Sequence, residues 1–220
     1  MLSIIIPTLN AALTLPACLA SVAGSPAAEI LVADGGSLDA TRAVAAAAGA
    51  RVVPAPRGRG SQLAAGIAAA RGDWLLLLHA DTRLAPEWRE AASAAMAGPP
   101  DRAFYFRFAL DSADPSARRL ERRVAWRCRR LGLPYGDQGM LIPRPLLEDV
   151  GGMRALPIME DVDLVRRLGR ARIAALPADA LTSAARWEGG GWRRRSARNL
   201  ACLGMWYAGV PPRIISRLYS

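Results

Sequence analysis

The chain has 220 residues, is 52% hydrophobic and carries a formal net charge of +10, so it can build a sizeable core and its surface should attract anions. It contains no Lys, which excludes a Walker-type phosphate loop and a Lys Schiff base. Its single histidine, His79, excludes metal sites with several His ligands.

Strands and helices are expected to alternate over the first 98 residues. Short apolar runs bounded by turn residues are typical of buried strands, and here they cover residues 2–6, 29–33, 51–53 and 72–79. Helices are expected between them, the first capped by Thr8 or Asn10, the second opened by Asp39 and Thr41, and the third over residues 61–71. This alternation predicts βαβ units and a parallel sheet.

The rhythm changes after the break Gly98-Pro99-Pro100. Further strands are expected at residues 103–108, 138–142 and 172–176, and further helices at residues 115–131, from residue 159 and at residues 192–207. Residues 1–98 are interpreted as a nucleotide-binding half and residues 99–185 as an acceptor-binding half that shares its sheet. Residues 186–220 are interpreted as an Arg/Trp loop followed by an amphipathic helix.

Asp81 follows an apolar run that begins after Gly72 and stops at His79. In open α/β sheets, ligands bind just beyond the carboxyl ends of the strands, and a carboxylate there is suited to hold a divalent cation against nucleotide phosphates. The same Asp could instead cap the helical pattern that Pro86 begins soon afterwards. On this stretch alone, both interpretations stay open.

Two further acidic sites have both a chemical and a structural interpretation. Asp34, in Asp34-Gly35-Gly36-Ser37, lies between a strand and a helix, where it could accept hydrogen bonds from a base or ribose or could simply shape a turn. Glu160 and Asp161 open a helix. Asp161 could take a proton from an attacking hydroxyl, and acidic residues are also favoured at any helix N-terminus.

Pro7-Thr8-Leu9-Asn10 follows the first strand, where a dinucleotide-binding fingerprint would place spaced glycines, and this argues against a nicotinamide-dependent dehydrogenase. Four motifs occur in the chain in this order: Pro7-Thr8-Leu9-Asn10, Asp34-Gly35-Gly36-Ser37, His79-Ala80-Asp81 and Glu160-Asp161-Val162-Asp163-Leu164. Through these motifs the chain resembles the family 2 glycosyltransferases of GT-A fold over most of residues 2–180. The chain is also similar to the group named for arsenosugar biosynthesis, in Leu78-His79-Ala80-Asp81-Thr82, Gly136-Asp137-Gln138-Gly139 and Arg186-Trp187.

The resemblance implies an α/β fold, in which a mixed, mostly parallel sheet is flanked by helices on both faces and residues 1–185 form a single domain. It implies a UDP- or GDP-sugar as donor. The residues expected to contact the donor are Pro7, Thr8, Asn10, Asp34, Gly60, Ala80 and Asp81.

The resemblance also implies the catalytic roles. Asp81 would hold Mn²⁺ or Mg²⁺ on the diphosphate, and Asp161 would be the general base. Arg186 and Trp187 would close over the diphosphate, unless they form an ordinary surface turn. The residues expected on the acceptor side are Gln138, Gly139 and Glu160.

Two positions depart from the family's pattern. His79 stands where the first Asp of the metal motif is usual, so the site has one negative charge fewer, and His79 itself could be a metal ligand or a core residue at a strand end. Ala64 stands where an Asn is common in the family, so one contact to the nucleotide-sugar donor is in doubt.

These parts predict metal-dependent transfer of a sugar to a hydroxyl acceptor whose identity the sequence does not reveal. A divalent ion and Arg guanidiniums would stabilise the leaving diphosphate while Asp161 deprotonates the attacking hydroxyl. One base without an evident protein nucleophile predicts a single displacement with inversion. Two alternatives stay open: a non-catalytic protein that binds sugar nucleotides or a membrane surface, and a nucleotidyltransferase, although the latter needs a Lys that is missing here.

Arg residues crowd positions 118–130, and Leu120, Val124 and Leu131 give the same segment an apolar stripe at helical spacing. This segment could contact acidic lipid headgroups or an anionic acceptor, or it could be a solvated helix face. The stretch from Trp192 to Tyr207 is similar and could lie on a membrane, pair with a second subunit in a homodimer or pack on its own domain. No nucleic acid is expected as a partner, because no recognised module accompanies the charge.

Cys18, Cys128 and Cys202 are scattered and odd in number, which predicts a reducing compartment rather than disulfides or a zinc site. Residues 2–6 are too short for a signal-peptide core, and no run approaches the roughly 20 apolar residues of a membrane span. We therefore expect a cytoplasmic protein, with the inner face of the membrane as the only other location considered.

Overall fold

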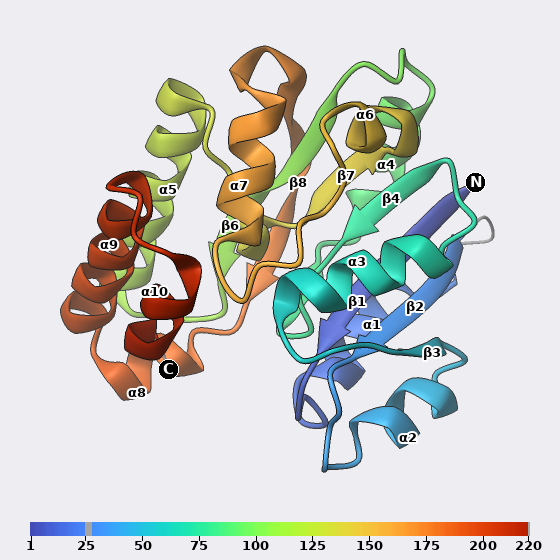
Figure 1. Cartoon of the computed structure of the whole chain (residues 1–220), viewed down its shortest axis with the longest axis horizontal. Coiled ribbons are helices and arrows are strands. Elements are labelled where there is room, and N and C mark those ends of the chain that lie inside the picture. The colour runs from blue at the N-terminus through green and yellow to red at the C-terminus, as the bar shows by residue number, and fades with distance from the viewer. Residues whose placement is uncertain (25–27, 220) are drawn as a thin grey trace.

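The computed structural model describes residues 1–24 and 28–219, and the side chains of Ala28, Arg186 and Tyr219 lie outside this description (Figure 1). Within the described part, eight strands form one sheet in the order β3-β2-β1-β4-β7-β6-β8-β5. The strands are β1 Leu2–Thr8, β2 Ala28–Asp34, β3 Arg51–Pro54, β4 Trp74–Leu77, β5 Thr82–Leu84, β6 Ala103–Leu110, β7 Met140–Pro143 and β8 Ile173–Thr182.

Strands β1 to β4 are mutually parallel, and β6 is parallel to β8, whereas β7 and β5 run antiparallel to their neighbours. Strand β7 connects the two parts of the chain, because it pairs with β4 on one side and β6 on the other. The expectations of a mixed, mostly parallel sheet and of one sheet shared by both halves are therefore confirmed.

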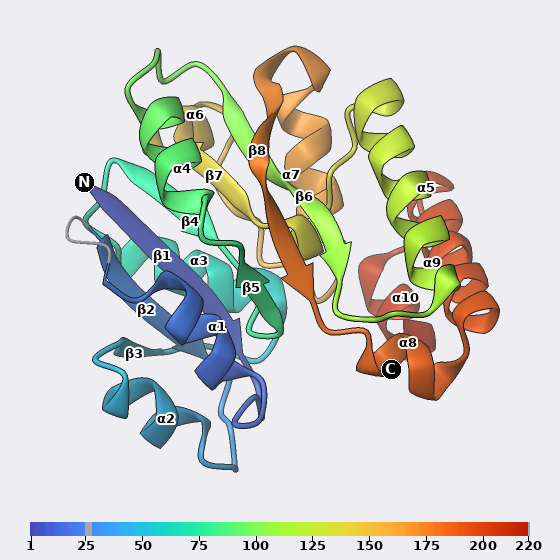
Figure 2. The same ribbon diagram turned by 180° about the vertical axis from the view of Figure 1, so that it is seen from behind.

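Helices cover both faces of this sheet (Figures 1 and 2). Helices α1 and α4 lie on one face and α3, α6 and α7 on the other, while α5, α8, α9 and α10 gather at the end of the molecule away from α2. The bounds are α1 Leu15–Val22, α2 Thr41–Ala47, α3 Arg59–Ala69, α4 Trp88–Met96, α5 Pro115–Leu131, α6 Arg144–Asp149, α7 Glu160–Leu168, α8 Ala185–Gly190, α9 Trp192–Tyr207 and α10 Pro212–Tyr219. None of the helices in the described ranges combines the length and the apolar character that crossing a membrane requires.

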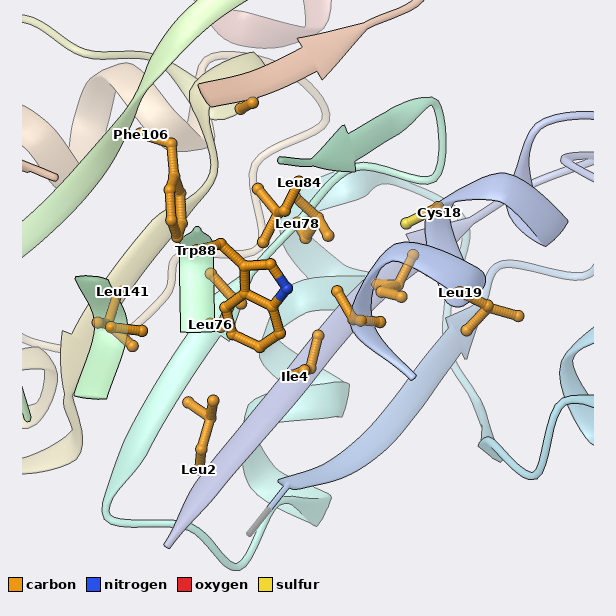
Figure 3. Packing of buried hydrophobic residues seen from close by; sticks show 14 of the residues in the cluster. Leu2, Ile4, Cys18, Leu19, Leu76, Leu78, Leu84, Trp88, Phe106 and Leu141 are labelled. Atoms are coloured by element: carbon orange, nitrogen blue, oxygen red, sulfur yellow. The ribbon is translucent and has the colours of Figure 1, made fainter. Parts of the chain in front are cut away.

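The core follows the alternation of side chains along the central strands. Ile4 belongs to the cluster under α1 and α4, and Ile5 belongs to the cluster under α3, α6 and α7. In the first cluster, the ring of Trp88 is 1% exposed and lies close to Leu76 and Leu78 (Figure 3). All four residues of β4 are buried, as expected for a strand covered on both faces.

The start of the first helix was predicted wrongly. Thr8 still belongs to β1, and α1 begins only at Leu15. Asn10 does not cap α1: its backbone is left-handed, with φ 51°, and its side-chain oxygen accepts a hydrogen bond from Leu38 N at 2.8 Å. Asn tolerates this conformation better than most residues, so Asn10 serves to bind two loops together.

Other differences concern short elements. The strand expected to reach His79 ends at Leu77, and a separate strand, β5, follows and pairs with β8. Helices α6, α8 and α10 were not expected, and each has eight residues or fewer, which is too short to show a clear apolar period. The bounds of α5 and α9 agree with the sequence pattern.

Candidate active site

The register of the sheet brings three distant segments to one edge. Parallel strands β1 to β4 end at the same edge, so Asp34 at the end of β2 and Asp81 after β4 both lie there. Strand β7 is antiparallel to β4, and Met140 at its start pairs with Leu77 at the end of β4. The short 3₁₀ turn Gly136–Gln138, which precedes β7, is therefore placed beside the residues that follow β4.

Gly136 lies between His79 and Asp161. Its backbone N–H donates a hydrogen bond to Asp161 Oδ2 at 2.7 Å, and Asp161 Oδ1 accepts another from Val162 N at 2.8 Å. A Cβ atom on Gly136 would stand 2.7 Å from His79 Nε2 and 3.1 Å from Asp161 Oδ2, which leaves room only for glycine. These three residues line a small hollow, whose other walls include Tyr135 and Met140.

Asp137, the next residue, brings a further carboxylate to this place. Burial raises the pKa of Asp137 to about 6; Arg127 acts to lower it, and the charges of Asp161 and Asp81 raise it further. Its backbone oxygen accepts a hydrogen bond from Thr182 Oγ1 at 3.0 Å. Asp137 lies in the motif Gly136-Asp137-Gln138-Gly139, from which no role for its side chain was predicted.

Glu160 and Gly60 lie in the region where α3 approaches α7 and the loop before it. Glu160 is 0% exposed and its Oε1 accepts a hydrogen bond from Arg59 Nε, forming an ion pair. Burial raises the pKa of Glu160, and the Arg59 charge opposes this shift. A Cβ atom on Gly60 would stand 2.5 Å from the backbone oxygen of Arg154, so α3 begins in close contact with the loop before α7. The donor role of Gly60 and the acceptor role of Glu160 stay predictions.

Asp34 is fixed by its own turn. It is 3% exposed and accepts hydrogen bonds from Ser37 N at 3.0 Å, Gly36 N at 3.2 Å and Thr8 Oγ1 at 3.3 Å. Burial alone would raise the pKa of Asp34, but a hydrogen bond from the Ser37 hydroxyl at 2.5 Å, together with these three, outweighs it and lowers the pKa. An open hollow adjoins this carboxylate, and its lining residues are Asp34, Gly36, Arg42, Val52, Pro54 and Ala55.

Gln62 was missed by sequence analysis. It is 4% exposed, and its Nε2 donates to the backbone oxygens of Thr8, at 2.5 Å, and of Ala33, at 3.1 Å. One amide on α3 thereby ties the ends of β1 and β2 together. A glutamine within a small-residue helix gives no signal of this kind until the helix is placed over the sheet.

Gln138, expected on the acceptor side, is buried and hydrogen bonded within the protein. Its Nε2 donates to Phe106 O at 3.1 Å, and its Oε1 accepts from Tyr135 N at 3.3 Å. These bonds hold the turn that presents Asp137. Gly139 is buried as well and has a φ of 62°, a left-handed conformation that favours glycine.

Trp187 stacks on Trp192, with ring centroids 5.9 Å apart, and the Arg195 guanidinium lies 5.4 Å from the Trp187 ring centroid. Trp187 also packs against the cluster under α5. The Arg186 side chain lies outside the described part of the structure, so the expectation that this pair closes over a diphosphate stays a prediction.

His79, Ala80 and Asp81, which follow β4 at the edge of the sheet, are each partly exposed. Among the described residues, no group of three or more His, Cys, Asp or Glu side chains is arranged to enclose a metal ion. A lone carboxylate such as Asp81 fits a different arrangement, because Mg²⁺ is commonly held by one or two carboxylates together with water and substrate phosphates. The donor set at this edge therefore fits a divalent ion that binds together with a diphosphate.

Comparisons with known proteins show the family of the chain. The profile of the family described as "Glycosyl transferase family 2" matches residues 3–157. The chain is 41% identical over 93 residues to a PGL/p-HBAD biosynthesis glycosyltransferase of Mycobacterium bovis and to one of Mycobacterium tuberculosis. Each match spans 38% of this chain and only 36% of the relative's length.

Solved structures resemble the fold. Glucosyl-3-phosphoglycerate synthase from Mycobacterium tuberculosis, in complex with Mn²⁺, UDP and glucosyl-3-phosphoglycerate, matches with a TM-score of 0.55 and 23% identity over 83% of this chain and 70% of that chain. A further mycobacterial protein matches with a TM-score of 0.58 and 24% identity over 83% of this chain and 66% of that one. At this level of identity the likeness shows the fold alone.

Proposed function

The chain belongs to glycosyl transferase family 2, and from this membership we propose that it transfers a sugar from a nucleotide-diphosphate donor to a hydroxyl acceptor. The observation that carries the proposal is the meeting of Asp81, the Gly136–Gln138 turn and Asp161 at the edge of the sheet. A UDP-sugar is the preferred donor over a GDP-sugar, because a solved neighbour of the same fold was crystallised with UDP and Mn²⁺.

Asp161 is the proposed general base. Both of its carboxylate oxygens accept backbone hydrogen bonds, from Gly136 and Val162, which fix the orientation of the carboxylate before substrate arrives. The acceptor hydroxyl oxygen attacks the anomeric carbon and its proton passes to Asp161, while the bond from that carbon to the diphosphate oxygen breaks. A single displacement of this kind inverts the anomeric configuration, and an NMR assay of the product checks it.

Asp81 is the proposed ligand for Mn²⁺ or Mg²⁺. When bound, such an ion would neutralise charge on the departing diphosphate. Asp81 is held in place through its backbone oxygen, which accepts a hydrogen bond from Ser183 N at 3.1 Å. His79 contacts Gly136 instead of lying apart in the core, so its Nε2 faces the same turn.

The nucleoside is proposed to bind along the loops after β1 and β2. Asp34 lines the hollow beside it, and Thr8 Oγ1 donates a hydrogen bond to its carboxylate. Pro7 and Asn10, on either side of Thr8 along the chain, are proposed to contact the nucleoside, and Gly60 and Ala80 to lie nearer the phosphates. Because the Asp34 carboxylate is held by its own turn, its position is set before the nucleoside binds. A carboxylate fixed in this way would accept hydrogen bonds from ribose hydroxyls or a base N–H.

A thermal-shift screen tests donor binding. We expect UDP, but not ADP, to raise the melting temperature in proportion to the logarithm of its concentration, and Mn²⁺ to strengthen the effect. Asp161→Asn should keep this shift but lose about 100-fold or more of the UDP released from a UDP-sugar in the presence of alcohol acceptors. Asp101→Asn, an exposed replacement of the same kind, should lose nothing.

The remaining alternatives make different predictions. Full turnover by Asp161→Asn would remove the proposed base. Donor binding without turnover in the wild-type protein, tested across UDP- and GDP-sugars, would favour a non-catalytic binding protein. Exchange of the nucleotide on a sugar 1-phosphate would favour a nucleotidyltransferase.

Finer assignments are proposals that rest on the sequence pattern. Residues 1–185 would act as one catalytic domain, with Gln138, Gly139 and Glu160 behind the acceptor site, and Arg186 and Trp187 near the diphosphate. The similarity to the arsenosugar-biosynthesis group is also a proposal that rests on the sequence pattern. A peripheral membrane contact is supported by Arg-rich α5 and α9, which expose Trp126 to 55% and Leu200 to 68%. A homodimer through α9 is the other use of that surface.

A further inference from the structure

The turn Gly136–Gln138 presents a carboxylate that the proposed chemistry does not yet use. Asp137 interacts electrostatically with both Asp81, the proposed metal ligand, and Asp161, the proposed base. Asp137 therefore lies close enough to Asp81 and Asp161, which come from two other segments, for their charges to act on it. Titratable side chains with a shifted pKa and specific charged neighbours cluster at functional sites.

One oxygen of the Asp137 carboxylate, Oδ1, has no hydrogen-bond partner among the described residues. This oxygen is also shut off from solvent. A buried carboxylate oxygen without a donor is costly, commonly by about 1–3 kcal/mol or more, because water no longer solvates it.

The two nearby guanidiniums are used elsewhere. Arg127 donates through Nε to Leu133 O at 2.8 Å and lies 3.9 Å from the Tyr135 ring centroid, whereas Arg59 pairs with Glu160. Neither of these contacts brings a donor to Asp137 Oδ1. The group that satisfies it is therefore expected to come from a ligand.

The position of Asp137 indicates which part of a donor would meet it. In the proposed reaction the diphosphate lies at Asp81 and the attacked carbon faces Asp161, so the sugar ring must occupy the space between them. The charges of both of these carboxylates act on Asp137. A sugar ring offers hydroxyl groups, and a carboxylate accepts hydrogen bonds from hydroxyls through either oxygen.

We propose that Asp137 binds hydroxyl groups of the transferred sugar and is a determinant of which donor sugar the protein accepts. This inference rests on the proposed function, since it requires a nucleotide-sugar donor. Two residues position the carboxylate. Thr182 donates a hydrogen bond to the Asp137 backbone oxygen, and the Gln138 side chain is hydrogen bonded to Phe106 and Tyr135. Discrimination follows because a sugar without the matching hydroxyl would leave the carboxylate unsatisfied.

Calorimetric titration tests the proposal by comparing the binding of UDP with that of UDP-glucose, both in the presence of Mn²⁺. If this pair does not bind, the titration is repeated with UDP-galactose, UDP-N-acetylglucosamine or GDP-mannose, each compared with its own nucleoside diphosphate. We expect Asp137→Ala to leave the Kd for the nucleoside diphosphate within about two-fold and to weaken the nucleotide sugar by about 10- to 100-fold, as loss of a hydrogen bond to a charged group implies. Asp137→Asn, which keeps one acceptor oxygen, should lie between Ala and wild type. Asp101→Asn is the matched control.

Deoxy analogues of the bound nucleotide sugar identify the hydroxyl. One deoxy position should weaken binding to the wild type and cause no further loss in Asp137→Ala, as expected for two groups that contact each other. Equal weakening of nucleoside diphosphate and nucleotide sugar by Asp137→Ala would overturn the proposal, because the carboxylate would then act on the metal or the diphosphate. Unchanged binding of both would overturn it as well. Failure of the wild type to bind any of these nucleotides would count instead against the proposed function, and circular dichroism confirms that each variant is folded.

Discussion

Arg59 Nε donates a hydrogen bond to Oε1 of Glu160, and this ion pair joins the first residue of α3 to the first residue of α7, 101 positions later. Glu160 is completely buried and directly precedes Asp161. The pair therefore links the half of the chain that would bind the nucleotide to the helix that carries the proposed base.

Removing Arg59 should destabilise the protein. In Arg59→Ala the buried Glu160 loses its counter-charge, and removal of one partner from a buried pair typically costs about 3–5 kcal/mol; because the Arg59 side chain is 33% exposed, we expect about 2 kcal/mol. Urea unfolding measures this change. Arg107→Ala breaks an exposed pair with Asp179 and should cost no more than about 1 kcal/mol. Equal losses in both variants would mean that Glu160 is not buried in solution.

The raised pKa of Asp137 predicts that the free energy of unfolding falls as the pH rises. Its pKa is about 6 in the folded protein against an ordinary value of 3.8, so the folded state holds the proton more tightly. The resulting stabilisation is complete below pH 3.8 and is lost as the pH rises through 6, and a difference of 6 − 3.8 = 2.2 corresponds to at most about 3 kcal/mol.

Asp137→Asn should therefore be more stable than the wild type at pH 8, and the difference should disappear near pH 4. Urea unfolding in EDTA across this range gives both curves without interference from metal. Asp101→Asn should follow the wild-type curve. Parallel curves for Asp137→Asn and wild type would show that this carboxyl titrates normally.

Gly136→Ala should damage catalysis more than stability. The added methyl group would overlap His79 Nε2 and press on Asp161 Oδ2, so the base would shift within the site. We expect kcat for UDP release to fall at least about ten-fold, since small displacements of a reacting group are costly, with an unfolding cost of about 1–3 kcal/mol. Gly204→Ala, where a Cβ atom meets nothing within 4 Å on α9, should keep full activity.

The surface formed by α5 and α9 should bind anionic vesicles. It combines many Arg residues with exposed apolar side chains, among them Trp126, Leu131, Leu200 and Tyr207. We expect co-sedimentation with phosphatidylglycerol-containing vesicles, little with phosphatidylcholine alone, and release by salt. Trp126→Ser should reduce binding several-fold, whereas Leu13→Ser, at a 97% exposed position outside these helices, should not. Binding that is indifferent to lipid charge would contradict this use of the surface.

Long-range arrangement was predictable from the sequence where local patterns were strong. The apolar run of β4, the Arg-rich period of α5 and the alternation over the first 98 residues each indicated their element, and the mixed sheet followed from them. The family resemblance then pointed to Asp81 and Asp161. What patterns could not supply was the register, which places Met140 opposite Leu77 and so brings Asp137 to the site.

Contacts between distant helices were also out of reach. The pairing of Arg59 with Glu160 and the two hydrogen bonds of Gln62 depend on how α3 lies over the sheet. Gln138 shows the same limit, because the sequence pattern places it near the acceptor side but does not reveal that its amide bonds to Phe106 O and Tyr135 N. In each case the side chain's partner is a backbone or side-chain atom that the local sequence does not name.

Helix α10 has a practical consequence for handling this protein. Ile215 is completely buried and packs in one cluster with Ile158, Met159 and Val162, the residues that flank Glu160 and Asp161. Trimming the chain ahead of Pro212 would uncover these residues and loosen the start of α7. An inactive truncated protein would then report a collapsed support rather than a missing substrate contact, so expression tags are better attached beyond this helix than substituted for it.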